Sequence, residues 1–316
     1  MILIVAASGR LGGTVAKHLL AQGKAVRLMT RNPSNLNHLK EQGAEVVSGD
    51  LRNPASLLSA CKGVEQVLAA AHALTGKGDN NPQTVDDAGN RQLIDAARAA
   101  GVKHFVFLSI LGASPDAPVE FFRIKYHTEE YLRASGLNFT IIRPSAFMDL
   151  WAQLIGQPIL EQGKTTIFGR GNNPINFVAV EDVVRFICIA FENSRTRNEV
   201  IEVGGPENLT LNQMSETFER VSGHEAKKRH VPLPMMRAMS ILMQPLNPAL
   251  SRQIRLGVFM DTANLCYNMT ETANTFGFQL TPFEEIARRT TRSAGSASSD
   301  EQAQVGVSRE RSPVNE

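Results

Sequence analysis

The sequence predicts an α/β protein with a doubly wound parallel sheet, in which helices cover both faces of the strands. Its first half alternates short β-branched runs with longer helical stretches. Such strand–helix repeats indicate right-handed crossovers, which place successive strands parallel in one sheet. Several helical stretches also end in glycine, which takes the left-handed conformation that closes a helix. These glycines are Gly23, Gly43, Gly63, Gly101 and Gly136.

The expected elements of the first half follow this alternation. We expect strands at residues 2–6, 25–30, 45–48, 66–70, 105–110 and 139–143. Between them, apolar residues recur at helical spacing, which predicts helices at residues 13–22, 34–42, 54–61, 83–100 and 120–134.

The rhythm changes after Pro144, where strands are expected at residues 165–168, 177–180 and 200–203 and helices at 181–191 and 211–221. We therefore divide the chain into a domain at residues 1–145, a small α/β region at 146–288 and a tail at 289–316. The middle region is expected on the substrate side, returning some strands to the main sheet. The tail is rich in Ser, Gly and charged residues, which bury too little apolar surface to offset ordering entropy, so we expect disorder.

Composition narrows the class of protein. The chain has 316 residues and a net charge of +2, without the concentrated basic surface that nucleic-acid binding requires. Its three cysteines, Cys61, Cys188 and Cys266, are far apart and match neither a disulfide framework nor a metal site. No stretch approaches the roughly 18 apolar residues of a transmembrane helix, and the apolar start is too short for a signal peptide. We expect a cytoplasmic protein without a membrane span, either monomeric or a homodimer.

A glycine motif lies where the first expected strand runs into the first helix. There the backbone at Gly9 can approach a pyrophosphate, Gly12 lets the helix pack closely on the strand, and the helix N-terminus offers free N–H groups. Alanine occupies the first glycine position, which costs on the order of 1 kcal/mol if the turn needs a positive φ. The alternative is a structural turn without a ligand. We favour a dinucleotide-binding Rossmann domain, with contacts from Ala6, Ser8, Gly9, Arg10, Leu11 and Gly12.

The end of the second strand distinguishes NAD from NADP. An acid there would bind the ribose 2′-hydroxyl, whereas this chain has Arg31, whose guanidinium can pair with a 2′-phosphate. NADP(H) is therefore expected rather than NAD(H), with help from Arg10. Asp50 either accepts from the adenine amino group or caps the turn before Pro54. Small side chains end the fourth strand. They would let the backbone lie close to the cofactor, but close packing in the core explains them nearly as well. The further expected contacts are Asp50, Leu51, Ala70, Ala71 and Lys125.

An ordered set of motifs resembles the NmrA-like branch of the atypical short-chain dehydrogenases/reductases. The motifs are IVAASGRLG at residues 4–12, GDL at 49–51, AAGVKHFV at 99–106, SGLNFTIIRP at 135–144, NFV at 176–178, EDV at 181–183 and GGPE at 204–207. The resemblance covers roughly residues 1–232. It implies a Rossmann fold with a small C-terminal substrate region, a preference for NADP(H), and members that are either reductases or non-catalytic redox sensors.

The catalytic pattern of short-chain reductases is incomplete. Those enzymes use a tyrosine as proton donor, a lysine four residues later and a serine opposite. Here Ser109 and Lys125 stand at the matching places, but Phe121 replaces the tyrosine. Tyr126 points about 100° away around the helix. Isoflavone-reductase-like relatives are similar and rely on the lysine alone, so Lys125 is a general acid, an anchor for the nicotinamide ribose, or a surface residue.

Other candidates are weaker. Asn90 either holds a water near the site or, as we prefer, lies on a helix surface, and Asp182 is expected to cap or start a helix. His72 follows the fourth strand and can contact a substrate. Neither it nor His104 or His127 has companion ligands at metal spacing.

A methionine-rich segment at residues 235–243 is apolar with one basic residue. It fits a wall or lid of an apolar pocket, a membrane-surface helix or plain core, and we favour the pocket wall.

Two functions follow from these observations. The first is an NADPH-dependent oxidoreductase that transfers a hydride to a small apolar carbonyl, quinone or enone, with Ser109 orienting the substrate and Lys125 holding the ribose. The alternative is a non-catalytic NADP(H)-binding redox sensor that acts through a protein partner; an assembly or scaffold factor would differ only in depending more on partners.

Overall fold

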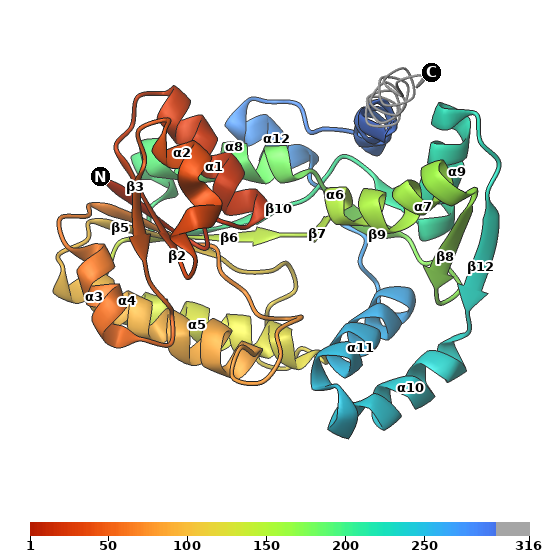
Figure 1. Ribbon diagram of the computed structural model, residues 1–316, viewed down its shortest axis with the longest axis horizontal. Helices are drawn as coiled ribbons and strands as arrows, with labels where there is room; N and C mark the ends of the chain where they lie inside the picture. The colour runs from red at the N-terminus through yellow and green to blue at the C-terminus, as the bar shows by residue number, and fades with distance from the viewer. Residues whose placement is uncertain (295–316) are drawn as a thin grey trace, which may run out of the picture.

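The centre of the molecule is a parallel sheet of seven strands. The computed structural model describes residues 1–294. The strands are ordered β10-β6-β5-β4-β1-β2-β3 (Figure 1), and every neighbouring pair is parallel. Their bounds are β1 Ile2–Val5, β2 Val26–Thr30, β3 Glu45–Ser48, β4 Gln66–Ala69, β5 His104–Leu108, β6 Phe139–Pro144 and β10 Glu199–Val203. The predicted fold class is confirmed.

Two apolar cores lie on the two faces of this sheet, because successive strand residues point in opposite directions. Ile2 and Ile4 of β1 pack with helices α1 (Arg10–Ala21) and α8 (Val180–Glu192). Leu3 and Val5 pack with the opposite layer. That layer contains α3 (Pro54–Cys61), α4 (Asn90–Ala99) and α5 (Glu120–Ala134), below the sheet in Figure 1.

Two expected helices differ in detail. The helix predicted at residues 34–42 is a 3-10 turn, Pro33–Leu36, followed by the short α2, Asn37–Lys40. The helix predicted at residues 83–100 begins as a π-helical segment, Pro82–Gly89, before α4. Asn81 caps this segment by accepting a hydrogen bond from the Thr84 backbone N–H. The five predicted left-handed glycines are confirmed, with φ between 71° and 98°.

The second half of the chain adds a smaller lobe and also completes the main sheet. Its own core includes Phe177, Phe218 and Phe283. β10 pairs with β6 and so extends the main sheet. The lobe contains the strands β7 Ala146–Phe147, β8 Lys164–Phe168, β9 Ile175–Val178, β11 Asn208–Leu209 and β12 Lys227–Val231. Its helical segments are α6 Met148–Trp151, a π-helical turn Ala152–Gly156, α7 Gln157–Gln162 and α9 Leu211–Ser222, while the 3-10 turn Ser194–Thr196 precedes β10.

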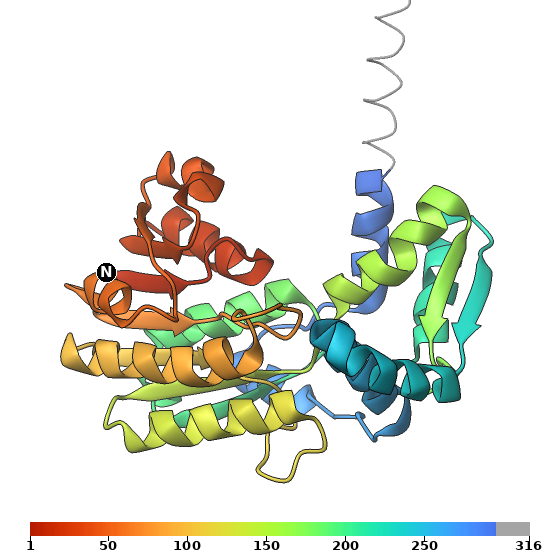
Figure 2. The same ribbon diagram turned by 60° about the horizontal axis from the view of Figure 1, so that its bottom comes forward.

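A helical hairpin follows β12. It consists of α10 (Leu233–Leu246) and α11 (Pro248–Thr262), which lie side by side at the bottom of Figure 1 and in front in Figure 2. The chain then returns to the main sheet through α12 (Thr270–Phe276), whose last residue packs on α8. Among residues 1–294, no helix is both long and apolar enough to cross a bilayer.

The predicted start of the tail needs correction. Residues 283–294 form a helix, so the expectation of disorder from residue 289 fails for its first residues. Ion pairs one turn apart, such as Arg289 with Glu285, support this helix, and Phe283 and Ile286 anchor it in the core. The rest of the predicted tail, residues 295–316, lies outside the described residues.

Candidate functional site

The turn after β1 adopts the conformation that the glycine motif predicts. Ala6 has φ of 66°, the left-handed region that favours glycine, so the strain expected of alanine is present. Its carbonyl accepts a hydrogen bond from the Gly9 N–H at 3.0 Å. A Cβ at Gly12 would lie 2.7 Å from the Ala6 carbonyl oxygen. Only glycine therefore allows α1 to pack this closely on the turn.

The N-terminus of α1 is open for an anion. No side chain caps it, and its first turn contains no acidic residue. The unpaired N–H groups and the positive end of the helix dipole would both favour a phosphate there. The turn and the helix thus fit a pyrophosphate.

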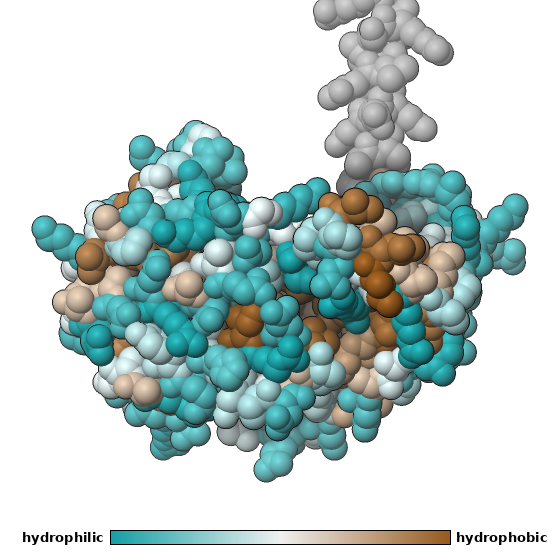
Figure 3. Space-filling view, turned by 90° about the horizontal axis from the view of Figure 1, so that it is seen from below, coloured by the Kyte–Doolittle hydropathy of each residue, from teal (hydrophilic) through white to brown (hydrophobic). Residues whose placement is uncertain are grey.

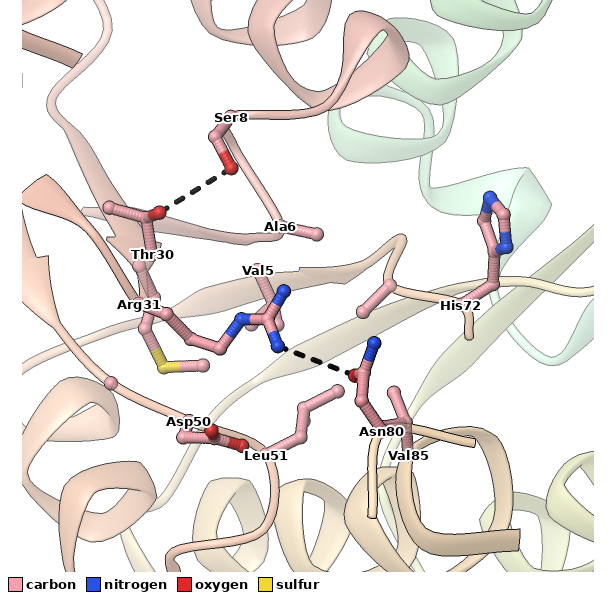
Figure 4. A pocket seen from close by; sticks show the side chains of 13 residues that line it. Val5, Ala6, Ser8, Thr30, Arg31, Asp50, Leu51, His72, Asn80 and Val85 are labelled. Carbon is pink, nitrogen blue, oxygen red and sulfur yellow. Dashed lines mark hydrogen bonds between the residues drawn. The ribbon is translucent and has the colours of Figure 1, made fainter. Parts of the chain in front are cut away.

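A cavity of about 130 Å³ adjoins this turn. It lies where the strand order reverses between β1 and β4, the usual ligand crevice of open α/β sheets. Residues at or just after the ends of four strands, β1 to β4, line it, as Figure 4 shows. Six of the predicted contacts meet here: Ala6, Ser8, Arg31, Asp50, Leu51 and Ala71.

Arg31 lines this cavity, and its guanidinium forms no ion pair with a carboxylate among residues 1–294. Its side chain reaches across the cavity, and its guanidinium donates to the Asn80 amide oxygen at 3.4 Å (Figure 4). On the other wall, the Thr30 hydroxyl donates to Ser8 at 3.4 Å. A guanidinium that is not ion-paired, at the end of β2, suits a 2′-phosphate.

Asp50 and Arg10 are held by other partners. The Asp50 carboxylate accepts from the backbone N–H and the guanidinium of Arg52, which together hold its pKa below the ordinary value. These contacts favour the turn-stabilising alternative over adenine recognition. Arg10 points away from the cavity and pairs with Asp149 at 3.0 Å. Leu11 packs into the core beside α8 instead of lining the cavity.

A second, apolar cavity of about 250 Å³ lies next to the first. The two share His72, which follows β4. The ends of β4, β5 and β6 form one side of the apolar cavity, and residues of α5, β7, α6, β9 and α11 form the rest of its wall. Ala70 and Lys125, predicted as cofactor contacts, line this cavity and not the first.

Lys125 is buried, with 3% of its surface exposed, so the surface-residue alternative is wrong. Its ammonium pairs with the buried Asp86 at 2.9 Å and donates to the Leu108 carbonyl at 3.3 Å. It also lies 5.5 Å from the centre of the Phe121 ring. Asp86 in turn accepts from the Ala73 N–H, which fixes the chain beyond β4. Through Asp86, Lys125 therefore connects α5 to the segment after β4, where His72 lines both cavities.

Ser109 lines the apolar cavity, but its proton is engaged. Its hydroxyl donates to Glu129, and that carboxylate forms two hydrogen bonds with Arg143 at 3.0 and 2.6 Å. The Ser109 hydroxyl is thus the donor in this hydrogen bond, and Glu129 is ion-paired with Arg143. Ser109 can accept a hydrogen bond from a ligand, while the expected donation to a substrate carbonyl would require breaking its bond to Glu129.

Three further polar residues line this cavity, and the sequence offered little or no indication of their roles. Ser145 is buried, and its hydroxyl has no partner among the described residues. Tyr267 comes from the loop after α11, and burial raises the pKa of its phenol. Desolvation, followed by the Lys125 charge, lowers the pKa of the His72 imidazole, although the residue as a whole is exposed. Position just after a strand was the available signal for His72 and Ser145, whereas no local pattern indicated Tyr267.

Four other candidates lie away from the two cavities. Asn90 is fully buried, which corrects the interpretation that it lies on a helix surface. Its amide donates to the Val85 and Asp86 carbonyls. Asp182 was expected to cap or start a helix; it lies in the first turn of α8 without capping it, and its carboxylate accepts from the Thr281 N–H and hydroxyl. His104 contacts Thr140, and His127 is exposed. Among residues 1–294 no His, Cys, Asp or Glu cluster is suited to a metal.

The methionine-rich segment 235–243 was expected to form a pocket wall, and this is wrong. No residue of α10 lines the apolar cavity; Leu256, Phe259 and Met260 of α11 do. The reason is the hairpin, which places α10 on the outer side of α11.

The sheet order, the left-handed turn before an uncapped helix and the crevice at the strand reversal define a Rossmann-type dinucleotide-binding protein. More narrowly, the chain belongs to the NmrA-like family, whose model matches residues 1–270.

Individual relatives carry different descriptions. Photosystem II assembly factor Ycf39 of Cyanophora paradoxa is 34% identical over 238 residues, 74% of this chain and 73% of that protein. NAD(P)H azoreductase of Xenophilus azovorans is 27% identical over 228 residues, 72% of this chain and 76% of the enzyme. Among solved structures, NADPH-dependent quinone oxidoreductase QOR2 of Escherichia coli in complex with NADPH has a TM-score of 0.76 at 23% identity, over 92% of this chain and 99% of that one. This last likeness shows the fold.

Proposed function

We propose that this protein is an NADPH-dependent oxidoreductase that reduces a small apolar carbonyl, quinone or enone. The observation that carries the proposal is the apolar cavity of about 250 Å³ that meets the cofactor cavity at His72. A substrate held there would lie beside the nicotinamide end of a bound dinucleotide. Quinone and azo reduction by the relatives QOR2 and NAD(P)H azoreductase agree with this class of reaction.

The cofactor of this protein is NADP(H). The uncapped start of α1 would receive the pyrophosphate, Ala6 and Ser8 would line its path, and Arg31 would pair with the 2′-phosphate. The bound cofactor supplies the hydride, and the protein supplies position and exclusion of water.

The remaining groups orient the substrate. Ser145 has a free hydroxyl that can donate to a substrate oxygen, and the protonated Tyr267 phenol offers a second donor. Lys125 stays paired with Asp86, since separating the two would leave a buried carboxylate without its cation. We assign Lys125 to holding the ribose and the cavity wall, and leave proton donation to the two hydroxyls.

Turnover is the direct test. Purified protein is mixed with NADPH and a panel of quinones, aldehydes and enones. With at least one substrate class, the absorbance of NADPH should fall as it is oxidised. On that substrate, Ser145→Ala and Tyr267→Phe should each lower kcat by about tenfold or more. NADPH binding without turnover on any of the panel would contradict the proposal.

The cofactor assignment has its own test. Arg31→Asp should lower the affinity for NADPH by about 10–100-fold, because one charged hydrogen-bonded contact is lost, and leave the affinity for NADH little changed. The matched control is Arg98→Asp, an exposed arginine on α4 that pairs with Asp95. Isothermal titration of both cofactors measures the effect. Equal losses of NADPH and NADH affinity would refute the 2′-phosphate contact.

A second function is favoured by one residue. Phe121 lines the cavity where short-chain reductases would have their tyrosine, and it cannot donate a proton. A non-catalytic NADP(H) sensor acting through a protein partner would need no donor, and the relative Ycf39 is named as an assembly factor. NADPH-dependent capture of a partner, together with no turnover, would favour this alternative.

A further inference from the structure

The outer side of α10 is apolar and faces solvent. Met235, Met239, Leu242 and Leu246 are spaced four, three and four residues apart, which places them on one side of the helix. Each of these four residues is between 38% and 76% exposed, and Ile241, on another side of the helix, is 67% exposed. Figure 3 shows hydrophobic side chains gathered over the hairpin on this face of the molecule.

This apolar face is not needed to hold α10 in place. The helix is attached by its other side, where Met236 and Ser240 are buried. The Met236 side chain lies against Gly257 of α11, and the Ser251 hydroxyl donates to the Ser240 carbonyl at 2.6 Å. A contiguous exposed apolar surface of this kind marks an interaction site.

The exposed charges of the hairpin have one sign. Its only carboxylate, Asp261 near the end of α11, is buried and paired with Arg170. Two exposed arginines of the hairpin, Arg237 and Arg255, have no carboxylate partner among residues 1–294. Arg237 lies on α10 itself, and Arg255 donates to Gln244 of α10. Exposed apolar residues and unpaired cations are therefore combined on one hairpin.

We propose that the outer face of α10 docks on an anionic lipid bilayer. Its apolar side chains would enter the interface between headgroups and acyl chains, and the arginines would meet the negative headgroups. A second copy of the chain fits less well, because a symmetric contact would bring these cations together without acids to offset them.

The inference does not rest on the proposed function, and vesicle binding tests it without turnover. The full chain should co-sediment with vesicles of phosphatidylcholine and phosphatidylglycerol at low salt, and bind vesicles of pure phosphatidylcholine about tenfold or more weakly. High salt should weaken the binding. Leu242→Glu with Leu246→Glu should abolish it. The matched control is Leu58→Glu on α3, because Leu58 is 52% exposed like Leu242 but outside the hairpin.

A charge variant separates the two contributions. Arg237→Glu with Arg255→Glu should remove the preference for phosphatidylglycerol and the salt dependence. Unchanged NADPH affinity and thermal midpoint would show that each variant is folded. Failure of the wild type to bind anionic vesicles at low salt would overturn the proposal, as would full binding by the Leu242→Glu/Leu246→Glu variant. A dimer that this variant dissociates, with no vesicle binding, would also overturn it and assign the face to self-association.

Discussion

Ala6 occupies a backbone conformation that costs an L-residue about 1–2 kcal/mol. We therefore expect Ala6→Gly to raise the free energy of unfolding by about 1 kcal/mol, after allowing for the greater entropy of glycine in the unfolded chain. Urea denaturation measures it. The control is Ala7→Gly, which should destabilise because Ala7 is buried and its φ is not positive. A destabilised Ala6→Gly variant would mean that the Ala6 methyl group contributes packing larger than the strain.

The buried pair of Lys125 and Asp86 predicts strong coupling between two residues. Lys125→Met should destabilise the protein by about 3–5 kcal/mol, because Asp86 would remain buried without its cation. Adding Asp86→Asn should recover most of this loss, since the amide oxygen can still accept from Ala73. Unfolding of the two single variants and the double variant gives the coupling energy. Additive losses would contradict a tight pair.

At the scale of single elements, β5 begins with a titratable group that is buried in the neutral form. Burial, with the nearby Arg197, lowers the pKa of His104 to about 4 from 6.5. The unfolded chain therefore takes up the proton first as the pH falls. The stability contribution is present above pH 6.5 and is lost as the pH falls towards 4.

This linkage can be measured. Between pH 7 and pH 5 we expect His104 to account for a loss of about 1–2 kcal/mol in the free energy of unfolding. His104→Gln should show a smaller loss over the same range, while His127→Gln, at an exposed position of α5, should behave as the wild type. Identical pH dependence of His104→Gln and the wild type would contradict the assignment.

Element prediction succeeded where local signals are strong. Five glycines close helices or turns with the predicted positive φ, and the strands of the main sheet lie within a residue or two of their expected bounds. It failed at α10, because a methionine-rich helix has the same periodicity whether it lines a pocket or lies outside one. The packing of the hairpin decides between these alternatives.

At the scale of the whole molecule, the cofactor cavity joins the ends of four strands, so a bound dinucleotide should stabilise the folded state. At a concentration about 100 times its Kd, NADPH should add about 2.7 kcal/mol to the free energy of unfolding and raise Tm. NADH at the same concentration should raise Tm less. Differential scanning fluorimetry measures both. Equal shifts for the two cofactors would argue against Arg31 as the discriminating residue.

The sequence by itself determined the alternation of strands and helices, the glycine turn with its strained Ala6, and the arginine at the end of β2. Each of these depends on residues that are close together in the chain, so local patterns suffice. The tertiary structure decided what depends on distant segments. It paired Lys125 with Asp86, turned the Ser109 proton towards Glu129, brought Tyr267 to Ser145 in one cavity and left α10 facing outward. Burial and partners are set by packing between elements, which no short stretch of sequence encodes.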